Sequence, residues 1–287
     1  MLVLCWLGWG FSYPATSTSL QGFDVWTLRS LSMLPSGLVM LAIAAANGGR
    51  IGITRPMIGP LLVAAALNIT VFQVCMAYGI TLMSSGRTAV IVYTMPLWAA
   101  LFAAFWLGER ITAARVAALA LGLAGIAVLM SQDLSDLENA PLGAASTLVS
   151  AIAFGAGTVW VKRFQRTLGA LDITALGGWQ LVLGGLPVLA LWPFLSGPTD
   201  LFAVPLASWI GLAYVVLIAN VLAYAAWFRV VQVFPATVSG LGSLAVPIVG
   251  VFSSALILSE QIGWREIAAL ALVCAALAIV LFEQKRG

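Results

Sequence analysis

The chain contains no histidine, and only 8% of its 287 residues are charged. Soluble domains have roughly 25% charged residues, so water is not expected to be the main solvent of this protein. Without histidine or paired acids inside apolar segments, a membrane-embedded enzyme is disfavoured as well. The three cysteines lie alone in separate apolar runs, whereas a metal or redox site needs a close pair. We therefore predict neither a metal site nor a cofactor.

Apolar residues make up 62% of the sequence. A hydrocarbon core of roughly 30 Å needs about 20 apolar residues per helix, so ten spans take up nearly the whole chain and leave no room for a soluble catalytic domain. The sequence predicts an all-α integral membrane protein. Its first apolar run lacks a basic leader and a small-residue cleavage site, so we expect a retained helix. The predicted spans are residues 2–20, 25–46, 57–82, 86–107, 112–131, 141–163, 172–195, 206–229, 236–257 and 264–282.

Basic residues are distributed unevenly between the two sides of these spans. Ten lie in even-numbered loops or in the C-terminal tail, whereas the odd-numbered loops hold only Arg87 and Arg265. Because basic loops stay in the cytoplasm, both termini are predicted to be cytoplasmic. The protein itself is predicted to lie in the inner (plasma) membrane. Arg29, near the outer end of the second span, is expected to reach the lipid headgroups. The basic residues form no single patch, so nucleic-acid binding is not expected.

The two halves of the chain are similar at an offset of 151 residues. This offset aligns Pro96 with Pro247 and Glu109 with Glu260, and the similarity continues into the fifth and tenth spans. Each half has five spans, an odd number, so we expect the second half to be inserted upside down relative to the first. Inverted repeats of this kind place the substrate site near the membrane midplane, and movement of one half against the other alternates access.

Residues 95–110 read MPLW…LGER, and residues 246–261 repeat the pattern as VPIV…LSEQ. These segments resemble the drug/metabolite transporter superfamily, EamA type, and the resemblance covers essentially the whole chain. The tryptophan and tyrosine content resembles that of its YddG-type exporters of aromatic and amphipathic amino acids. The resemblance implies two EamA-like five-helix repeats, residues 1–131 and 141–282, in a ten-helix inner-membrane carrier of metabolites.

Pro96 and Pro247 each lie inside a predicted span. A proline deprives the carbonyl four residues earlier of its helical partner, and here these are the carbonyls of Val92 and Ser243. We therefore expect a kink at both places. The pair could form a hinge that offers a carbonyl to a substrate ammonium group, or each could be a static packing kink.

The eighth span carries Asn220, Tyr224 and Trp227 at spacings of four and three residues, a polar and aromatic stripe that would be costly against lipid. The offset of 151 maps it onto a stripe that includes Gln73 and Met76 in the third span. We expect both stripes to line an interior cavity, although a packing role remains open for each residue. The predicted substrate-binding residues are Trp9, Tyr13, Gln73, Met76, Tyr78, Tyr93, Trp98, Trp160, Asn220, Tyr224, Trp227 and Ser243.

No aspartate or glutamate lies well inside a predicted span, which disfavours proton coupling through a buried carboxylate. Phosphorylated substrates are disfavoured too, because they would need buried basic residues. We therefore predict a transporter of neutral or zwitterionic, partly apolar small molecules, in particular aromatic or other apolar amino acids, working by alternating access in the lipid bilayer. The alternatives are an exporter of drugs or organic cations with the same fold, and a non-transporting membrane sensor. No sequence feature indicates an oligomeric state.

Overall fold

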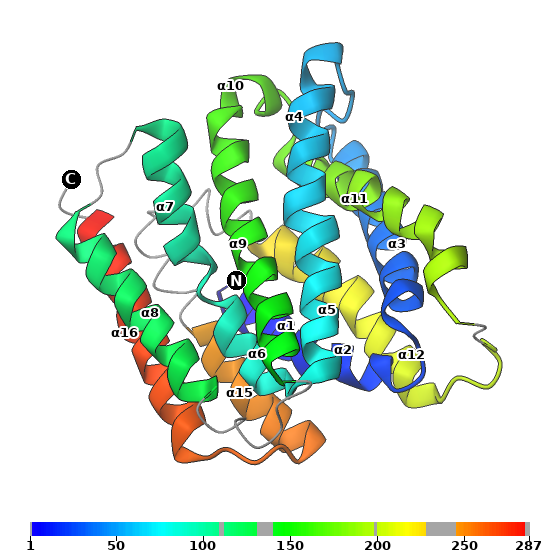
Figure 1. Cartoon of the computed structure of the whole chain (residues 1–287). Coiled ribbons are helices and arrows are strands. Elements are labelled where there is room, and N and C mark those ends of the chain that lie inside the picture. Colours follow the sequence, from blue (N-terminus) through cyan, green and yellow to red (C-terminus); the bar gives the residue numbers. More distant parts are fainter. Residues whose placement is uncertain (1, 109–111, 131–139, 198–199, 228–244, 285–287) are drawn as a thin grey trace.

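The computed structural model describes residues 2–108, 112–130, 140–197, 200–227 and 245–284 (Figure 1). All regular structure in these ranges is helical, in agreement with the predicted all-α class. The helices are α1 (Leu2–Gly10), α2 (Ser12–Leu20), α3 (Val25–Ala46), α4 (Arg55–Ala65), the π-helical η1 (Ala66–Val71), α5 (Phe72–Leu82), α6 (Ser85–Val92), α7 (Met95–Leu107), α8 (Ala113–Met130), α9 (Ala140–Arg163), α10 (Gln165–Leu168), α11 (Ile173–Leu195), α12 (Leu206–Ala213), the π-helical η3 (Tyr214–Leu222), α15 (Ala245–Leu258) and α16 (Trp264–Gln284).

Six helical stretches of the described residues are long and apolar enough to cross a membrane. Shorter apolar helices occupy residues Val116–Val128 and Ala245–Leu258. The ten-span arrangement and the cytoplasmic position of the termini stay predictions. The six stretches are Val25–Ala46, Arg55–Leu82, Ser85–Leu107, Pro141–Arg163, Ile173–Leu195 and Leu206–Trp227.

The fourth predicted span is broken where Pro96 predicts a kink. Helix α6 ends at Val92 and α7 begins at Met95, and the N–H of Thr94 donates to the carbonyl of Ile91 at 3.0 Å in a tighter turn. The expected kink is thus confirmed here. Pro247 lies in the first turn of α15, whereas the Ser243 carbonyl lies outside the described residues.

The first predicted span is also broken, at a place where no break was predicted. Pro14 follows the boundary between α1 and α2 and deprives the Gly10 carbonyl of its helical partner. The hydroxyl of Ser253 in α15 donates to that carbonyl at 3.2 Å. A helix distant in sequence therefore satisfies the group that the proline leaves unpaired.

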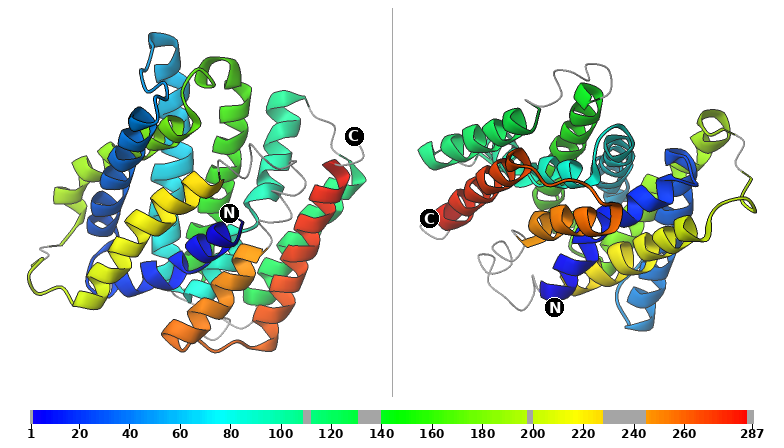
Figure 2. Two further views of the ribbon diagram at one scale, coloured as in Figure 1. Left: turned by 180° about the vertical axis from the view of Figure 1, so that it is seen from behind. Right: turned by 90° about the horizontal axis from the view of Figure 1, so that it is seen from below.

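Two helix pairs occupy opposite edges of the bundle (Figures 1 and 2). At one edge α3 packs on α11, where a Cβ added to Gly37 would lie 2.8 Å from the carbonyl oxygen of Gly178. At the other edge α8 packs on α16, where a Cβ added to Gly125 would lie 3.2 Å from the carbonyl oxygen of Ala269. Such small residues let helix backbones approach closely in membranes.

The offset of 151 residues relates several of these elements to one another. It carries α3 onto α11 and α8 onto α16, so each edge pair joins two related helices. It also carries the π-helical η1 onto residues 217–222 of the π-helical η3. An irregularity this uncommon, repeated at equivalent positions, supports the predicted internal repeat.

Asp24 caps the N-terminus of α3. Its carboxylate accepts hydrogen bonds from the N–H of Trp26 at 2.8 Å, from Thr27 and from the hydroxyl of Ser196 at 2.6 Å. Burial acts to raise the pKa of the Asp24 carboxyl, but these hydrogen bonds outweigh it, and the pKa lies below its ordinary value of 3.8. The cap therefore stabilises the fold at neutral pH, and this stabilisation is lost as the pH falls below 3.8 through the lowered pKa.

Glu260, the acid of the second repeat motif, caps α6. Its Oε1 accepts from the N–H of Ser85 at 2.8 Å and its Oε2 from the N–H of Gly86 at 3.0 Å. The first N–H groups of a helix have no partner within it, and the helix dipole favours a negative charge beside them. One carboxylate thus joins the end of α15 to the start of α6.

We expect Glu260→Ala to lower the free energy of unfolding by about 2 kcal/mol, because hydrogen bonds to a charged group contribute roughly 1.5–3 kcal/mol. Thermal unfolding in detergent, followed by tryptophan fluorescence, measures the loss. Glu260→Gln is the matched control, since the amide keeps one oxygen acceptor, and its midpoint should lie between those of wild type and Glu260→Ala. An unchanged midpoint for Glu260→Ala would show that the cap does not stabilise the protein.

Candidate functional site

Three of the predicted binding residues form one aromatic cluster. The ring of Trp9 in α1 lies 5.3 Å from the ring of Tyr224, nearly perpendicular to it, and 5.6 Å from the ring of Trp227. The indole N–H of Trp9 donates to the carbonyl of Ala219 in η3 at 3.1 Å. The ring contacts and this hydrogen bond join the first predicted span to the described part of the eighth.

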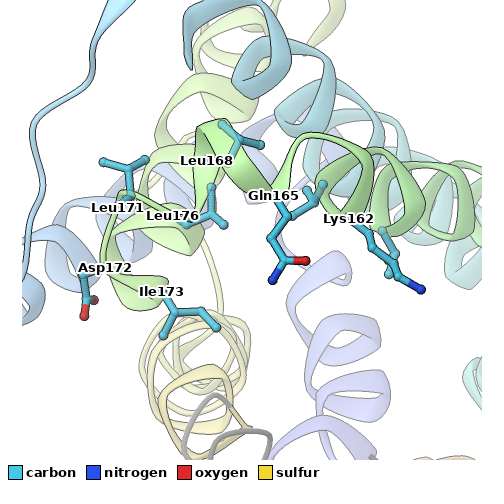
Figure 3. Close-up of a pocket in the computed structure, with 10 residues that line it drawn as sticks. Lys162, Gln165, Leu168, Leu171, Asp172, Ile173 and Leu176 are labelled. Atoms are coloured by element: carbon cyan, nitrogen blue, oxygen red, sulfur yellow. The ribbon is translucent and has the colours of Figure 1, made fainter. Parts of the chain in front are cut away.

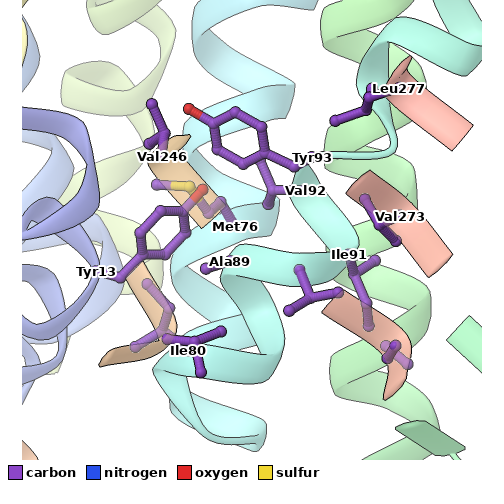
Figure 4. Packing of buried hydrophobic residues seen from close by; sticks show 14 residues of the cluster. Tyr13, Met76, Ile80, Ala89, Ile91, Val92, Tyr93, Val246, Val273 and Leu277 are labelled. Carbon is purple, nitrogen blue, oxygen red and sulfur yellow. The ribbon is translucent and has the colours of Figure 1, made fainter. Parts of the chain in front are cut away.

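A second group, next to Trp9, is buried where four helical segments meet (Figure 4). Tyr13 comes from α2, Met76 from α5, Tyr93 from the break between α6 and α7, and Val246 from α15. Tyr13 and Tyr93 are only 4% and 5% exposed, yet neither hydroxyl makes a hydrogen bond within the described part of the chain. We name Tyr13, Met76 and Tyr93, together with Trp9, Tyr224 and Trp227, the aromatic site.

The break at Pro96 explains the position of Tyr93. Its backbone ψ of 6° leaves the helical range, so the chain turns there before α7 begins. Thr94 satisfies the local backbone by donating from its hydroxyl to the carbonyl of Ile91 at 2.7 Å. Near this break, the Tyr93 ring is buried in a cluster that contains residues of both halves of the chain.

The two amides of the predicted stripes are buried inside the protein. Asn220 is 6% exposed, and its Nδ2 donates to the hydroxyl of Ser36 at 3.2 Å. Gln73 is 3% exposed and accepts two hydrogen bonds from Arg29. Both amides thus connect their spans to α3.

The expectation for Arg29 was wrong. Arg29 does not reach the lipid headgroups, because its side chain is 1% exposed and enclosed where α3 packs against α5. Its Nε donates to the carbonyl of Gln73 at 3.0 Å and its Nη1 to the Oε1 of Gln73 at 3.2 Å, while Nη2 is buried and finds no partner in the part of the chain that the structure describes. The spacing of residues along the helix could have indicated that Arg29 is buried. Arg29 shares one helical face with the buried Met33, Ser36 and Met40.

Other predicted binding residues have different contacts. Tyr78 is 37% exposed, and its hydroxyl accepts from the indole N–H of Trp26 at 2.8 Å. This contact joins α3 to α5 and does not place Tyr78 in the aromatic site. Ser243 lies outside the described residues.

Trp98 and Trp160 also make contacts of a structural kind. The indole of Trp98 donates to the hydroxyl of Thr94, one turn earlier, at 3.3 Å. The indole of Trp160 donates to the carbonyl of Pro60 in α4 at 3.0 Å, and its ring lies 5.8 Å from that of Trp106. Neither ring contact nor hydrogen bond joins these two tryptophans to the aromatic site among the described residues.

A cavity of about 520 Å³ lies elsewhere, at the turn from α9 through α10 to α11 (Figure 3). Lys162, Gln165 and Asp172 line it together with apolar side chains, and no residue of the aromatic site does. The Asp172 carboxylate already caps α11, accepting from the N–H of Thr174 at 2.8 Å. Asp172 therefore already has a structural role, and the cavity lies at an end of the helical bundle. For these two reasons we do not assign the substrate to this cavity.

Comparison with known proteins identifies transporters as relatives of this chain. The sequence model of the EamA-like transporter family matches residues 1–131 and 141–282. The chain is 24% identical to the uncharacterized transporter YoaV of Bacillus subtilis (strain 168), over 97% of this chain and 94% of that protein. It is 24% identical to a probable amino-acid metabolite efflux pump of Escherichia coli (strain K12), over 70% of this chain and 68% of that protein.

One solved crystal structure has a similar fold. It superposes with a TM-score of 0.69 at 21% sequence identity, and the match covers 99% of this chain and 96% of that one. At this identity the likeness describes the fold alone.

We expect Tyr13→Phe and Tyr93→Phe to change the free energy of unfolding by less than about 0.5 kcal/mol, because each removes a hydroxyl without a hydrogen bond. Trp9→Phe is the matched comparison, and it should lower stability by about 1 kcal/mol since it removes the bond to Ala219. Thermal unfolding in detergent measures all three. A loss of 2 kcal/mol or more in either tyrosine variant would mean that its hydroxyl has a structural partner.

Proposed function

The chain belongs to the EamA-like transporter family, and from that premise we propose that it exports amino acids and related small metabolites, aromatic or otherwise partly apolar, across the inner membrane. The observation that carries this proposal is the aromatic site. Its rings come from α1, α2, the break after α6 and the residues that follow η3. The family and the named relatives are transporters rather than enzymes.

The chemistry of the aromatic site suits a zwitterion with an apolar side chain. Aromatic rings pack on apolar and aromatic groups, with offset or edge-to-face geometry preferred. An ammonium group over such a ring gains roughly 0.5–2 kcal/mol. The hydroxyls of Tyr13 and Tyr93, without partners among the described residues, are available to a polar substrate group.

We propose alternating access as the mechanism, between two inverted five-helix repeats at residues 1–131 and 141–282. The matching π-helical segments and the pairing of related helices support the repeat. In this mechanism the prolines Pro96 and Pro247 act as hinges, since the helix break after α6 is a place where backbone angles can change without disrupting packed helices. The distribution of basic loop residues supports a cytoplasmic position for both termini.

The proposed transport needs no proton. The chain has no histidine, and its predicted spans contain no acid far from their ends. Carriers that couple to protons generally use an ionisable group inside the membrane. The substrate gradient, or exchange against a second substrate, then sets the direction of transport.

A panel of labelled amino acids in proteoliposomes tests this proposal. We expect uptake of phenylalanine, tryptophan and leucine to exceed that of lysine and glutamate, and Trp9→Ala to reduce phenylalanine uptake by about tenfold through lost ring contacts. Trp264→Ala is the matched control, because Trp264 is 66% exposed and should leave uptake unchanged.

Two results would contradict the proposal. Inhibition by quaternary ammonium compounds without any uptake of amino acids would indicate an exporter of organic cations. Binding of amino acids without flux would indicate a membrane sensor.

A further inference from the structure

Arg29 is a buried positive charge inside a membrane-spanning helix. It is 1% exposed and lies in α3, whose residues Val25–Ala46 are long and apolar enough to cross the membrane. A charged side chain within a membrane-spanning helix is unfavourable, and those found there generally pair with a partner or contribute to function. The burial of Arg29 therefore requires a compensating interaction.

The protein compensates only part of this cost. Arginine has five N–H donors, and the structure uses Nε and Nη1, which both donate to Gln73. Nη2 is buried and has no hydrogen-bond partner among the described residues. The bonds to Gln73 fix the plane of the guanidinium group and leave one of its ends free to donate.

No anion of the described structure neutralises Arg29. The nearest acid in the sequence, Asp24, is already bound to Trp26, Thr27 and Ser196 at the end of α3. The described residues of the helices packed against α3 contain no aspartate or glutamate; these helices are α2, α5, α11, α12 and η3. The positive charge is thus left for a group from outside the described chain.

A structural bridge between helices would not need this charge. The residue that the 151-residue offset pairs with Arg29 is Gln180 in α11. Gln180 also binds the third predicted span, because its Oε1 accepts from the Nδ2 of Asn68 at 2.8 Å. At the position equivalent to Arg29, a neutral amide therefore joins α11 of the second half to the third predicted span of the first half, and the charge is the feature that distinguishes Arg29.

Arg29 is linked to the aromatic site through Gln73 of α5. Gln73 precedes Met76 by three residues on α5, a spacing that places both side chains on one face of the helix. Met76 packs with Tyr13 and Tyr93 in the same buried cluster. Arg29 therefore binds the residue that lies about one helical turn before Met76, a member of that site.

We propose that Arg29, oriented by Gln73, binds the carboxylate of the transported amino acid while the aromatic site receives its side chain. A planar guanidinium group matches the two oxygens of a carboxylate. The same positive charge repels organic cations, so this inference names the substrate class of the site. It rests on the proposed function and adds the requirement for a carboxylate.

Transport of L-phenylalanine and of its amide by reconstituted wild type tests the inference. The amide keeps the ring and the ammonium group but has no carboxylate. We expect wild type to prefer phenylalanine by about tenfold or more, and Arg29→Gln to abolish this preference by reducing phenylalanine uptake while leaving amide uptake unchanged or higher. Arg29→Lys should keep the preference at lower affinity, because it retains a positive charge.

Thr70→Val is the control for a merely structural effect. It removes the hydrogen bond from the Thr70 hydroxyl to the Gly184 carbonyl, 2.8 Å long, on the same span as Gln73 but without a change in charge. We expect it to leave the ratio of phenylalanine to amide uptake unchanged. The wild-type ratio alone needs no variant, so misfolding of Arg29→Gln would not prevent the test.

A wild type that transports the acid and the amide equally well would overturn the inference, as would an Arg29→Gln variant that lowers both by the same factor. In either case amino-acid transport itself would stand. A wild type that transports neither compound nor any other amino acid would contradict the proposed function instead.

Discussion

The hydrocarbon core of a membrane offers no hydrogen bonds, so every polar group within it must find a partner in the protein. In this structure the irregular parts of the helices meet that requirement through side chains of distant helices. Ser253 donates to the Gly10 carbonyl left unpaired by Pro14, and Trp9 donates to the Ala219 carbonyl in a π-helical segment. The breaks in the helices are therefore places where hydrogen bonds join helices distant in sequence.

The same constraint bears on the region to which we assign the substrate. Tyr93 lies in the break that Pro96 causes, and it meets Tyr13 and Met76 from other spans. Two nitrogens of the Arg29 guanidinium group donate to Gln73, and the third has no partner among the residues that the structure describes. An unpartnered donor and a group of aromatic rings suit a molecule with both polar and apolar parts, which is the class of substrate we propose.

The sequence predicted those features that depend on local chemistry. Apolar run lengths gave the six long spans of the described chain, and Pro96 gave the break after α6. The π-helical segments were missed, because hydropathy carries no signal for one extra residue in a helical turn. The predicted position of Arg29 was wrong, and Tyr78 lies outside the aromatic site. Both have the same cause: the position of a residue in the sequence indicates its depth in the membrane, but not which neighbouring helix covers its face.

We propose that the carrier, once loaded with substrate, switches the side of the membrane to which its binding site is open, and that no proton moves with it. Counterflow with reconstituted wild type measures this directly, as uptake of labelled L-phenylalanine into liposomes preloaded with the unlabelled compound at equal internal and external pH. The preload should accelerate labelled uptake several-fold over empty liposomes, since a carrier returns faster when loaded. Uptake that ignores the preload, or that arises only under an imposed pH gradient, would contradict the claim.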